Sequence, residues 1–244
     1  MSHTDKKLPA HIAIMMDGNG RWAQQQGHER TFGHQNGVEA VRSVIEGAGE
    51  MGIRYLTLYA FSTENWNRPK EEVEMLMTLL VQSIHNELER LMANHVRLMM
   101  TGRINDMPEA CRDALQDAIR QTAGNDGLTV ILALSYSGRT ELTDAVRKIA
   151  SDCALGLRNA DDITADDIQH ALYHPDIPDP DILIRTGGEC RVSNFLLWEI
   201  AYTELFFSPI MWPDFRKTHL AEIINAYQNR ERRYGKIGEQ VREH

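Results

Sequence analysis

The chain has 244 residues, 42% of them hydrophobic, a formal net charge of -9 and three cysteines. This length suits one domain with a full core, and no Pro/Gly/Ser-rich linker divides it. The acidic balance argues against a general nucleic-acid surface, because binding to a phosphate backbone needs an excess of Lys and Arg over one face. Any anion site must therefore be local.

Cellular location follows from the cysteines and from the N-terminal residues. Cys111, Cys153 and Cys190 form an odd set without a pairing pattern, and residues 1–13 lack the apolar core of a signal peptide. No apolar run approaches the about 20 residues of a membrane span. We expect a cytoplasmic protein whose contact with lipid is at most a transient, peripheral one at the inner face of the membrane.

Six apolar runs follow one another along the chain, with helical patterns between nearly all of them. Their continuous hydrophobicity is typical of strands buried on both faces, as in a parallel sheet covered by helices. The sequence predicts an α/β fold: a single domain over 11–233, flanked by a flexible segment, 1–10, and a tail, 234–244. The runs occupy residues 11–16, 54–61, 96–102, 128–135, 181–186 and 203–207.

The first polar cluster follows the run at 11–16. Asp17 offers oxygen ligands to a hard cation, while Gly18 and Gly20 let backbone N–H groups approach an anion closely. Arg21 adds a planar fork of donors. This pattern predicts a site for a metal and a phosphate, although a tight turn whose Asp caps the next helix is an equally simple interpretation of the segment alone.

The second cluster ends the run at 54–61 and precedes a long helical pattern that starts near Lys70. Ser62, Asn65 and Arg68 are hydrogen-bonding groups with Trp66 among them, but such residues before a proline also mark the start of many helices. The helix at 71–92 is apolar around much of its girth. It is either deeply buried or one wall of an apolar tunnel between helices and sheet.

The third cluster follows the run at 181–186. Arg185 and Arg191 bracket a Gly-Gly turn and are followed by the hydroxyl of Ser193, a pattern that suits a diphosphate clamp. An arginine at the end of an apolar strand would be costly without an anionic partner. Because ligands bind beyond the carboxyl ends of strands in open parallel sheets, we expect the three clusters to converge.

Together these motifs resemble those of one protein family. The segments DGNGRWA (17–23), GHQNG (33–37), FSTENWNRP (61–69) and RTGGECRVSNFLLWEIAYTELFFSPIMWPDF (185–215) resemble the cis-prenyltransferases, above all their bacterial members, from about residue 11 to residue 233. The resemblance implies a parallel sheet ringed by helices, a homodimer, and a magnesium-dependent condensation of an allylic diphosphate with successive isopentenyl diphosphates in cis. The expected starter is farnesyl diphosphate, and the expected product is a long polyprenyl diphosphate that carries cell-wall sugars.

The resemblance also implies residue roles. Asp17 matches the magnesium ligand, and Glu204 matches a second carboxylate linked to magnesium. The groups that match those holding the allylic diphosphate are Gly18, Asn19, Gly20, Arg21, Arg30 and His34. The residues that match the substrate-binding loop are Trp22, Ser62, Thr63, Glu64, Trp66 and Arg68. The isopentenyl diphosphate site is matched by Arg185, Arg191, Val192 and Ser193.

Asn65 stands where the family has its proposed proton acceptor. A neutral amide is a poor base, so Asn65 is better suited to orient a diphosphate oxygen or a water that takes the proton. Cys190 is interpreted as a bystander, because the sequence offers it no evident His partner.

Several positions depart from the family pattern, among them Ser137, which replaces a glycine, and Arg103, which stands where an acidic residue is frequent. Ile131 and Ser135 replace amides in a strand close to the expected tunnel, and Glu199 replaces a frequent glutamine. A bulkier strand there would bear on product length.

Three other classes of protein are the alternatives to this family. A haloacid dehalogenase-type phosphohydrolase needs a second Asp where this chain has Asn19. A non-catalytic partner subunit would have lost Asp17 and the phosphate arginines, and a lipid-binding protein would need the cavity alone.

Overall fold

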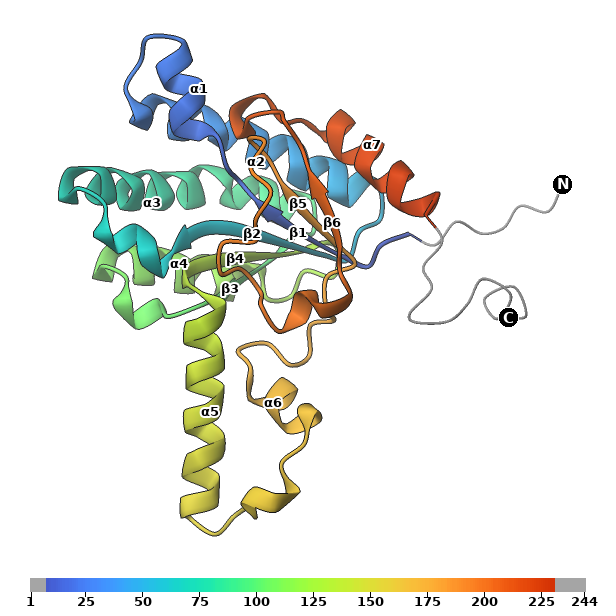
Figure 1. The fold of residues 1–244 in the computed structure, drawn as a ribbon. Coiled ribbons are helices and arrows are strands. Elements are labelled where there is room, and N and C mark those ends of the chain that lie inside the picture. Colours follow the sequence, from blue (N-terminus) through green and yellow to red (C-terminus); the bar gives the residue numbers. More distant parts are fainter. Residues whose placement is uncertain (1–7, 231–244) are drawn as a thin grey trace, which may run out of the picture.

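A sheet of parallel strands in the order β3-β4-β2-β1-β5-β6 organises the molecule (Figure 1). The structure is a computed structural model and describes residues 8–230. Each apolar run predicted from the sequence matches one strand with ends that differ by one residue or less, so the predicted six-stranded α/β fold is confirmed. The strands are β1 (His11–Met15), β2 (Tyr55–Ser62), β3 (Arg97–Thr101), β4 (Thr129–Tyr136), β5 (Ile182–Arg185) and β6 (Glu204–Phe207).

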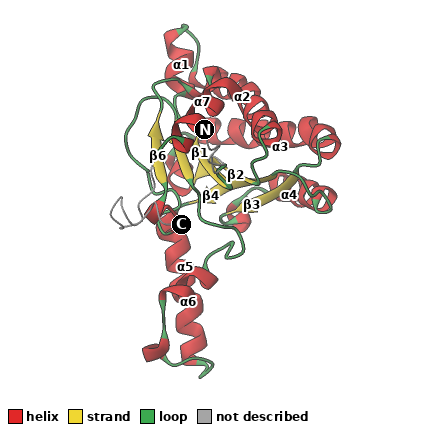
Figure 2. Ribbon diagram, turned by 90° about the vertical axis from the view of Figure 1, so that its right-hand side faces the viewer, coloured by secondary structure: helices red, strands yellow, loops and turns green. Residues whose placement is uncertain are grey.

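Helices cover one face of this sheet, where α2, α3, α4 and α7 pack on it (Figures 1 and 2). The other face packs against the segment that follows β5, through Phe195, Leu196 and Ile200, and against Tyr173. In Figure 2, α5 and α6 extend below the sheet, away from α1, α2 and α7. The helices are α1 (Asn19–Gln25), α2 (Arg30–Glu50), α3 (Lys70–Ala93), α4 (Glu109–Thr122), α5 (Gly138–Ala154), α6 (Ala165–Ala171) and α7 (Lys217–Gln228).

Alternation along each strand explains the two cores. In β1, Ile12 and Ile14 belong to the cluster under α2 and α3, whereas Ala13 and Met15 belong to the cluster on the opposite face, with Phe195. Successive side chains of a strand point to opposite faces, so a strand covered on both sides must be apolar at every position. The unbroken hydrophobicity of the runs therefore has a direct structural cause.

The strand order places a switch in direction beside β1. The chain leaves β1 toward β2 on one side, while β5, on the other side of β1, leads on to β6. Met15 at the end of β1 lies opposite Arg185 at the end of β5. The crevice outside the carboxyl ends of strands at such a point is the usual ligand site of an open parallel sheet.

Two further expectations concern the ends of the chain and the membrane. The predicted tail, 234–244, and most of the predicted flexible segment, 1–10, lie outside the described residues. Between residues 8 and 230, no helix is both long enough and apolar enough to cross a bilayer.

Candidate active site

The first and third polar clusters meet in an ion pair at the switch point. The Arg185 guanidinium donates from Nη2 to Oδ2 of Asp17 at 2.8 Å and from Nε to the same oxygen at 3.3 Å. Arg185 is 4% exposed, whereas the Asp17 side chain is 36% exposed. The anionic partner expected for this buried arginine is thus Asp17, whose carboxylate still faces solvent.

Backbone geometry holds Asp17 in this place. Thr186 accepts a hydrogen bond from the Asp17 N–H at 3.0 Å and donates to the Asp17 carbonyl at 2.7 Å. Gly18 has φ 105°, a left-handed conformation that a side chain disfavours. A Cβ on Gly187 would lie 2.8 Å from Nη2 of Arg21, so this glycine lets the arginine approach the Asp17 backbone. Nη2 of Arg21 lies 3.7 Å from the Asp17 carboxylate.

Arg185 also organises the loop after β5. Its Nη1 donates to the Arg191 carbonyl and to Oγ of Ser193, the latter at 2.8 Å. The Arg191 side chain turns outward and pairs with Glu189. The two arginines therefore differ: Arg185 is a buried organiser, whereas Arg191 is exposed and available to a ligand. Val192 follows Arg191 and is part of the loop backbone between it and Ser193.

The start of α2 packs tightly on the loop after β1. A Cβ on Gly33 would lie 1.9 Å from the Asn19 carbonyl, and one on Gly20 would lie 2.7 Å from Cζ of Arg30. Arg30 thus lies over the loop that carries Asp17. Asn19 is buried and donates to the Met16 carbonyl at 2.9 Å, but its Oδ1 finds no hydrogen-bond partner within residues 8–230. A buried acceptor of this kind suits a ligand-bearing site.

His34 lies in the same region and is held neutral. Its burial, followed by the nearby charges of Arg68 and Arg30, lowers the pKa of the imidazole to about 4. At neutral pH, His34 can donate or accept a hydrogen bond but adds no positive charge. Trp22 faces the other way and donates from its indole N–H to Asp214 at 2.8 Å.

The loop after β2 forms a short 3₁₀ helix, η1 (Thr63–Asn67). Oδ1 of Asn65 accepts the Ser62 N–H at 3.1 Å, so these two residues do start a helix, but it is η1 and not the long α3, whose N-cap residue is Pro69. Arg68 pairs with Glu72 at 3.0 Å. Asn65 and Arg68 nevertheless line a cavity with their remaining donors, so the structural and ligand-facing roles coexist.

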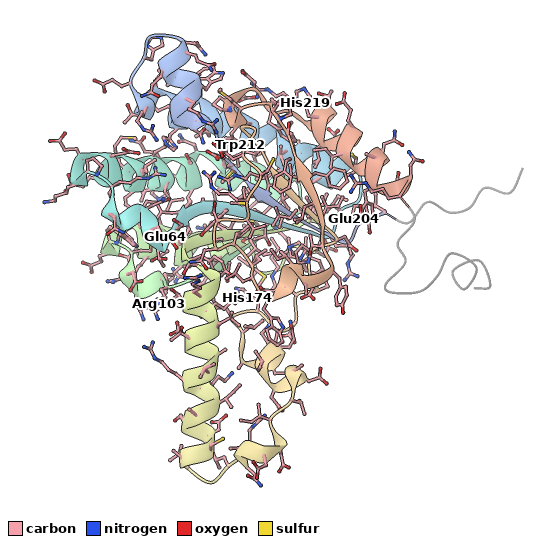
Figure 3. The ribbon with its side chains drawn as sticks, in the orientation of Figure 1. Glu64, Arg103, His174, Glu204, Trp212 and His219 are labelled. Atoms are coloured by element: carbon pink, nitrogen blue, oxygen red, sulfur yellow. The ribbon has the colours of Figure 1, made fainter. Side chains whose placement is uncertain are left out.

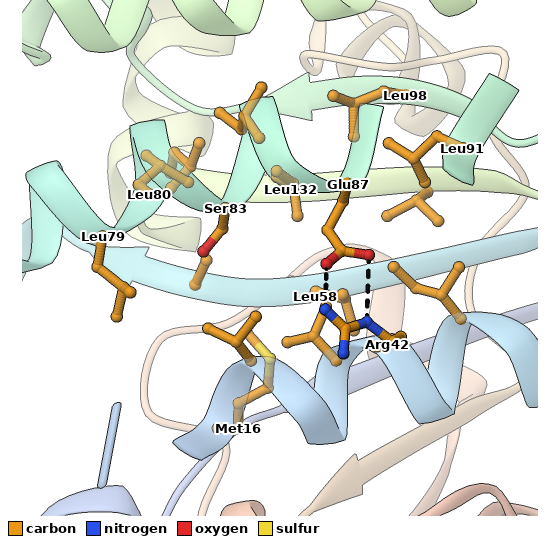
Figure 4. A pocket seen from close by; sticks show the side chains of 18 of the residues that line it. Met16, Arg42, Leu58, Leu79, Leu80, Ser83, Glu87, Leu91, Leu98 and Leu132 are labelled. Atoms are coloured by element: carbon orange, nitrogen blue, oxygen red, sulfur yellow. Dashed lines mark hydrogen bonds and ion pairs between the residues drawn. The ribbon is translucent and has the colours of Figure 1, made fainter. Parts of the chain in front are cut away.

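That cavity has a volume of about 670 Å³ and lies between the sheet, α2 and α3 (Figure 4). Its polar end contains Asn19, His34, Asn65 and Arg68, and apolar side chains such as Leu58, Leu80 and Leu132 line the rest. Volumes of about 300 to 1,000 Å³ are typical of pockets that enclose a small ligand. The helix at 70–93 is therefore a cavity wall as well as a core element.

An ion pair bridges the two helices along this cavity. Arg42 of α2 donates to both carboxylate oxygens of Glu87 of α3, from Nε at 3.3 Å, and Figure 4 shows the pair spanning the space between the helices. The pair continues to Glu39 on one side and to Arg90 on the other. Charged side chains thus line the outer side of the cavity.

One departure noted in the sequence does not reach this cavity. Val130, Leu132 and Leu134 of β4 line it, whereas Ile131 lines a small cavity on the opposite face. The expectation that Ile131 makes the tunnel wall bulkier is wrong, because neighbouring side chains of a strand face opposite sides. Ser135 is buried and accepts the Trp66 indole N–H at 2.9 Å.

Glu204, which the resemblance matches to a second carboxylate linked to magnesium, does not lie beside Asp17 within one chain. Glu204 begins β6 opposite Ile182, at the amino end of β5, whereas the site lies at the carboxyl end. Its carboxylate pairs with Arg230 at 2.9 Å. Figure 3 shows Glu204 on the side of the molecule opposite Glu64, which follows β2. No group of three potential metal ligands of the His, Cys, Asp and Glu types occurs in the described part of the chain.

Three residues of the site were not predicted from the sequence. Thr186 fixes the Asp17 backbone, Asp214 anchors Trp22, and Asn194 donates to the Glu64 carboxylate at 2.7 Å. Thr186 and Asn194 directly follow predicted site residues, and this adjacency was the one available signal. Their partners are more than a hundred positions away in the sequence.

The carboxyl group of Glu199 lies on the opposite face of the sheet. Oε2 of Glu199 is buried without a hydrogen-bond partner among residues 8–230, and burial, reinforced by Glu141, raises the pKa of Glu199 to about 8. Glu141 is itself 3% exposed and accepts hydrogen bonds from Tyr136 and from the Tyr173 N–H.

Glu199→Gln is therefore expected to stabilise the protein at alkaline pH. Since the folded-state pKa is raised, the folded state holds more protons than the unfolded state between about pH 4.5 and 8, and stability falls as the pH rises through this window. The variant removes this loss. Its melting temperature should exceed that of the wild type at pH 8 and approach it at pH 5, and an equal difference at both pH values would contradict the assignment.

Comparison with known proteins agrees with this geometry. The family model described as "Putative undecaprenyl diphosphate synthase" matches residues 15–235. An isoprenyl transferase of Porphyromonas gingivalis is 52% identical, covering 96% of this chain and 92% of its own length. A farnesyl-diphosphate-specific ditrans,polycis-undecaprenyl-diphosphate synthase of Vibrio vulnificus is 47% identical, covering 97% and 94%. The crystal structure of lavandulyl diphosphate synthase from Lavandula x intermedia in complex with dimethylallyl diphosphate superimposes with a TM-score of 0.91 at 34% identity, covering 94% and 99%.

Proposed function

This chain belongs to the undecaprenyl diphosphate synthase family of cis-prenyltransferases, and on that basis we propose that it makes undecaprenyl diphosphate in a magnesium-dependent reaction. Farnesyl diphosphate is the proposed starter, and successive isopentenyl diphosphates extend it in cis. The product would serve as the lipid carrier for cell-wall polysaccharide synthesis. The observation that carries the proposal is the buried Arg185 beside Asp17, at the polar end of an apolar cavity.

The first half of the reaction demands a site that stabilises an anion and protects a cation. Breaking the allylic C–O bond leaves negative charge on diphosphate and positive charge on carbon. Arg21 lies in α1 and Arg30 lies at the start of α2, where they can hold the departing diphosphate together with backbone N–H groups. The apolar walls keep water from the cation.

The donors beside the proposed diphosphate site suit a magnesium ion. Asp17 presents a partly exposed carboxylate, a hard oxygen ligand, beside arginines that would bind diphosphate. Mg²⁺ is usually held by one or two carboxylates together with substrate phosphates, so one protein carboxylate fits this habit. When bound, the ion would neutralise charge on the leaving diphosphate. Within one chain, the proposed ligand set is Asp17 alone, because Glu204 lies at the other end of the sheet.

The second substrate is proposed to bind at the loop after β5. Arg191, with its exposed side chain, and Ser193, whose hydroxyl accepts from Arg185 at 2.8 Å, would bind the diphosphate of isopentenyl diphosphate. The proton lost in the condensation cannot be taken by Asn65 as a base, since it is an amide whose Oδ1 already accepts the Ser62 N–H. We assign Asn65 the orientation of a diphosphate oxygen or water.

The growing chain is proposed to occupy the cavity between the sheet, α2 and α3. Its walls match an apolar chain, and its polar end lies beside the proposed diphosphate site. The reaction product is oily, so transient contact of a cytoplasmic enzyme with the membrane surface would accompany release. A homodimer is also proposed. In its support, the edge strand β6 exposes Leu205 and Phe207, and an apolar edge strand is commonly covered by a partner.

Turnover by the purified protein tests the function. Incubation with farnesyl diphosphate, labelled isopentenyl diphosphate and Mg²⁺ is expected to give one long polyprenyl diphosphate, identified by chromatography against polyprenol standards. Chelation with EDTA should abolish the reaction, and added Mg²⁺ should restore it. Binding of polyprenyl diphosphate without any condensation would instead favour a lipid-binding protein.

A further inference from the structure

The loops that follow β2 and β5 are joined by one side-chain hydrogen bond. Nδ2 of Asn194 donates to Oε1 of Glu64 at 2.7 Å. Strand β1 lies between β2 and β5 in the sheet, so this bond links the two flanks of the strand that leads to Asp17. It joins the loop that carries Asn65 and Arg68 to the loop that carries Arg191 and Ser193.

Both ends of the Asn194 amide are engaged, which defines its orientation. Oδ1 accepts the Arg139 N–H at 2.9 Å at the start of α5, while Nδ2 donates to Glu64. The Asn194 carbonyl accepts the Gly138 N–H at 2.7 Å. The residue has φ 63°, a left-handed conformation that Asn and Asp adopt more readily than other side chains.

The charge on Glu64 makes this bond a strong one. Burial opposes ionisation of Glu64, but its hydrogen bonds, led by that from Asn194, outweigh burial and hold the pKa of the carboxyl below its usual range. The contact is therefore charge-assisted, and such bonds are roughly twice as strong as neutral ones. The other hydrogen bonds to the Glu64 carboxylate come from its own loop, including those from Ser62 and Thr63, so Asn194 is the partner that joins it to the loop after β5.

We propose that Asn194 is a positioning residue that couples the two substrate half-sites by tethering Glu64, and with it the η1 loop, to the isopentenyl diphosphate clamp. This role rests on the proposed function. Order in the clamp after β5 then favours the η1 conformation in which Asn65 and Arg68 line the diphosphate end of the cavity. Glu64 contributes as the acceptor of the tether rather than as a ligand of substrate.

Asn194→Asp isolates the tether from the other contacts of the residue. The new carboxylate can still accept the Arg139 N–H and tolerates the left-handed backbone, but it repels Glu64. We expect kcat/KM for isopentenyl diphosphate to fall about tenfold to a hundredfold, the range for losing a hydrogen bond to a charged group. The melting temperature should stay close to that of the wild type, because the altered contact is exposed.

The double variant Glu64→Gln/Asn194→Asp supplies the decisive comparison. It restores the bond with its polarity reversed, since the Gln amide now donates to the Asp carboxylate. Most of the lost kcat/KM should return, which a general structural defect would not allow. Glu64→Ala breaks the same bond from its exposed side and should reproduce the fall even if Asn194→Asp fails to fold. Asn67→Asp, which places the same charge on an exposed residue of η1, should change kcat/KM by less than about twofold.

Two results would overturn the tether: single variants with wild-type kcat/KM, or a double variant no better than Asn194→Asp. Failure of the proposed function is distinguishable from both, because the wild-type protein would then show no condensation at all. Binding of isopentenyl diphosphate with and without an unreactive allylic thiolodiphosphate gives an independent measure. The affinity enhancement that this analogue causes in the wild type should shrink in Asn194→Asp and return in the double variant.

Discussion

Asp17→Asn is expected to abolish condensation while leaving the fold intact. The amide cannot supply the anionic oxygen that a hard cation prefers, but its Oδ1 can still accept from the buried Arg185, so the local packing survives. Loss of one preorganised electrostatic group typically lowers kcat by about a hundredfold to a thousandfold, and loss of a metal ligand adds to this. Steady-state assays at several Mg²⁺ concentrations, with melting curves, measure both effects.

Asp17→Ala is the harsher companion to this variant. It should be equally inactive and also less stable, because Arg185 would be left without its acidic partner in a nearly closed environment. A near-normal rate for either variant would contradict the assignment of Asp17 to the metal and the leaving diphosphate.

Arg185→Ala and Arg191→Ala are expected to differ sharply, although the sequence suggests equivalent roles. Arg191→Ala should raise KM for isopentenyl diphosphate about tenfold to a hundredfold and leave the allylic KM nearly unchanged, since it removes about 1.5 to 3 kcal/mol of charge-assisted binding from one substrate. Arg185→Ala removes the bonds to Asp17, to the Arg191 carbonyl and to Ser193 together. It should impair both substrates and lower the melting temperature.

Initial rates with each substrate varied in turn, together with melting curves, separate the two arginines. Arg185→Lys is a useful control, because a single ammonium keeps the charge but cannot reproduce the forked contacts to Asp17 and to the loop. Equal increases of both KM values in Arg191→Ala would refute its assignment to the isopentenyl diphosphate site.

Local pattern accounts for much of what the sequence predicted correctly. The strands are apolar at successive positions because both faces are covered, and polar residues begin where each strand ends, at Asp17, Ser62 and Arg185. The helix expected at 71–92 is α3, and Val73, Ile84 and Leu91 lie on its buried side. The carboxyl ends of parallel strands share one edge, so the convergence of Asp17 with Arg185 was also predictable.

Register and facing could not be predicted in the same way. Glu204 follows the third cluster closely in sequence, yet β6 runs parallel to β5 and returns it to the amino end of the sheet. Ile131 is adjacent to two cavity-lining residues but faces the opposite core. The parallel direction of β6 decides the place of Glu204, whereas the alternation of side chains along β4 decides that of Ile131, which a one-residue shift would turn to the other face.

The sequence by itself determined the family, the six parallel strands and the polar loops at their carboxyl ends, because these depend on residue order and on which side chains avoid water. Only the tertiary structure decided that Arg185 donates hydrogen bonds to Asp17 and to its own loop, that the Arg191 side chain is exposed, and that Asn194 donates to Glu64. These are contacts between residues far apart in the chain. Their partners are chosen by strand order and register, which the packing of the whole domain sets.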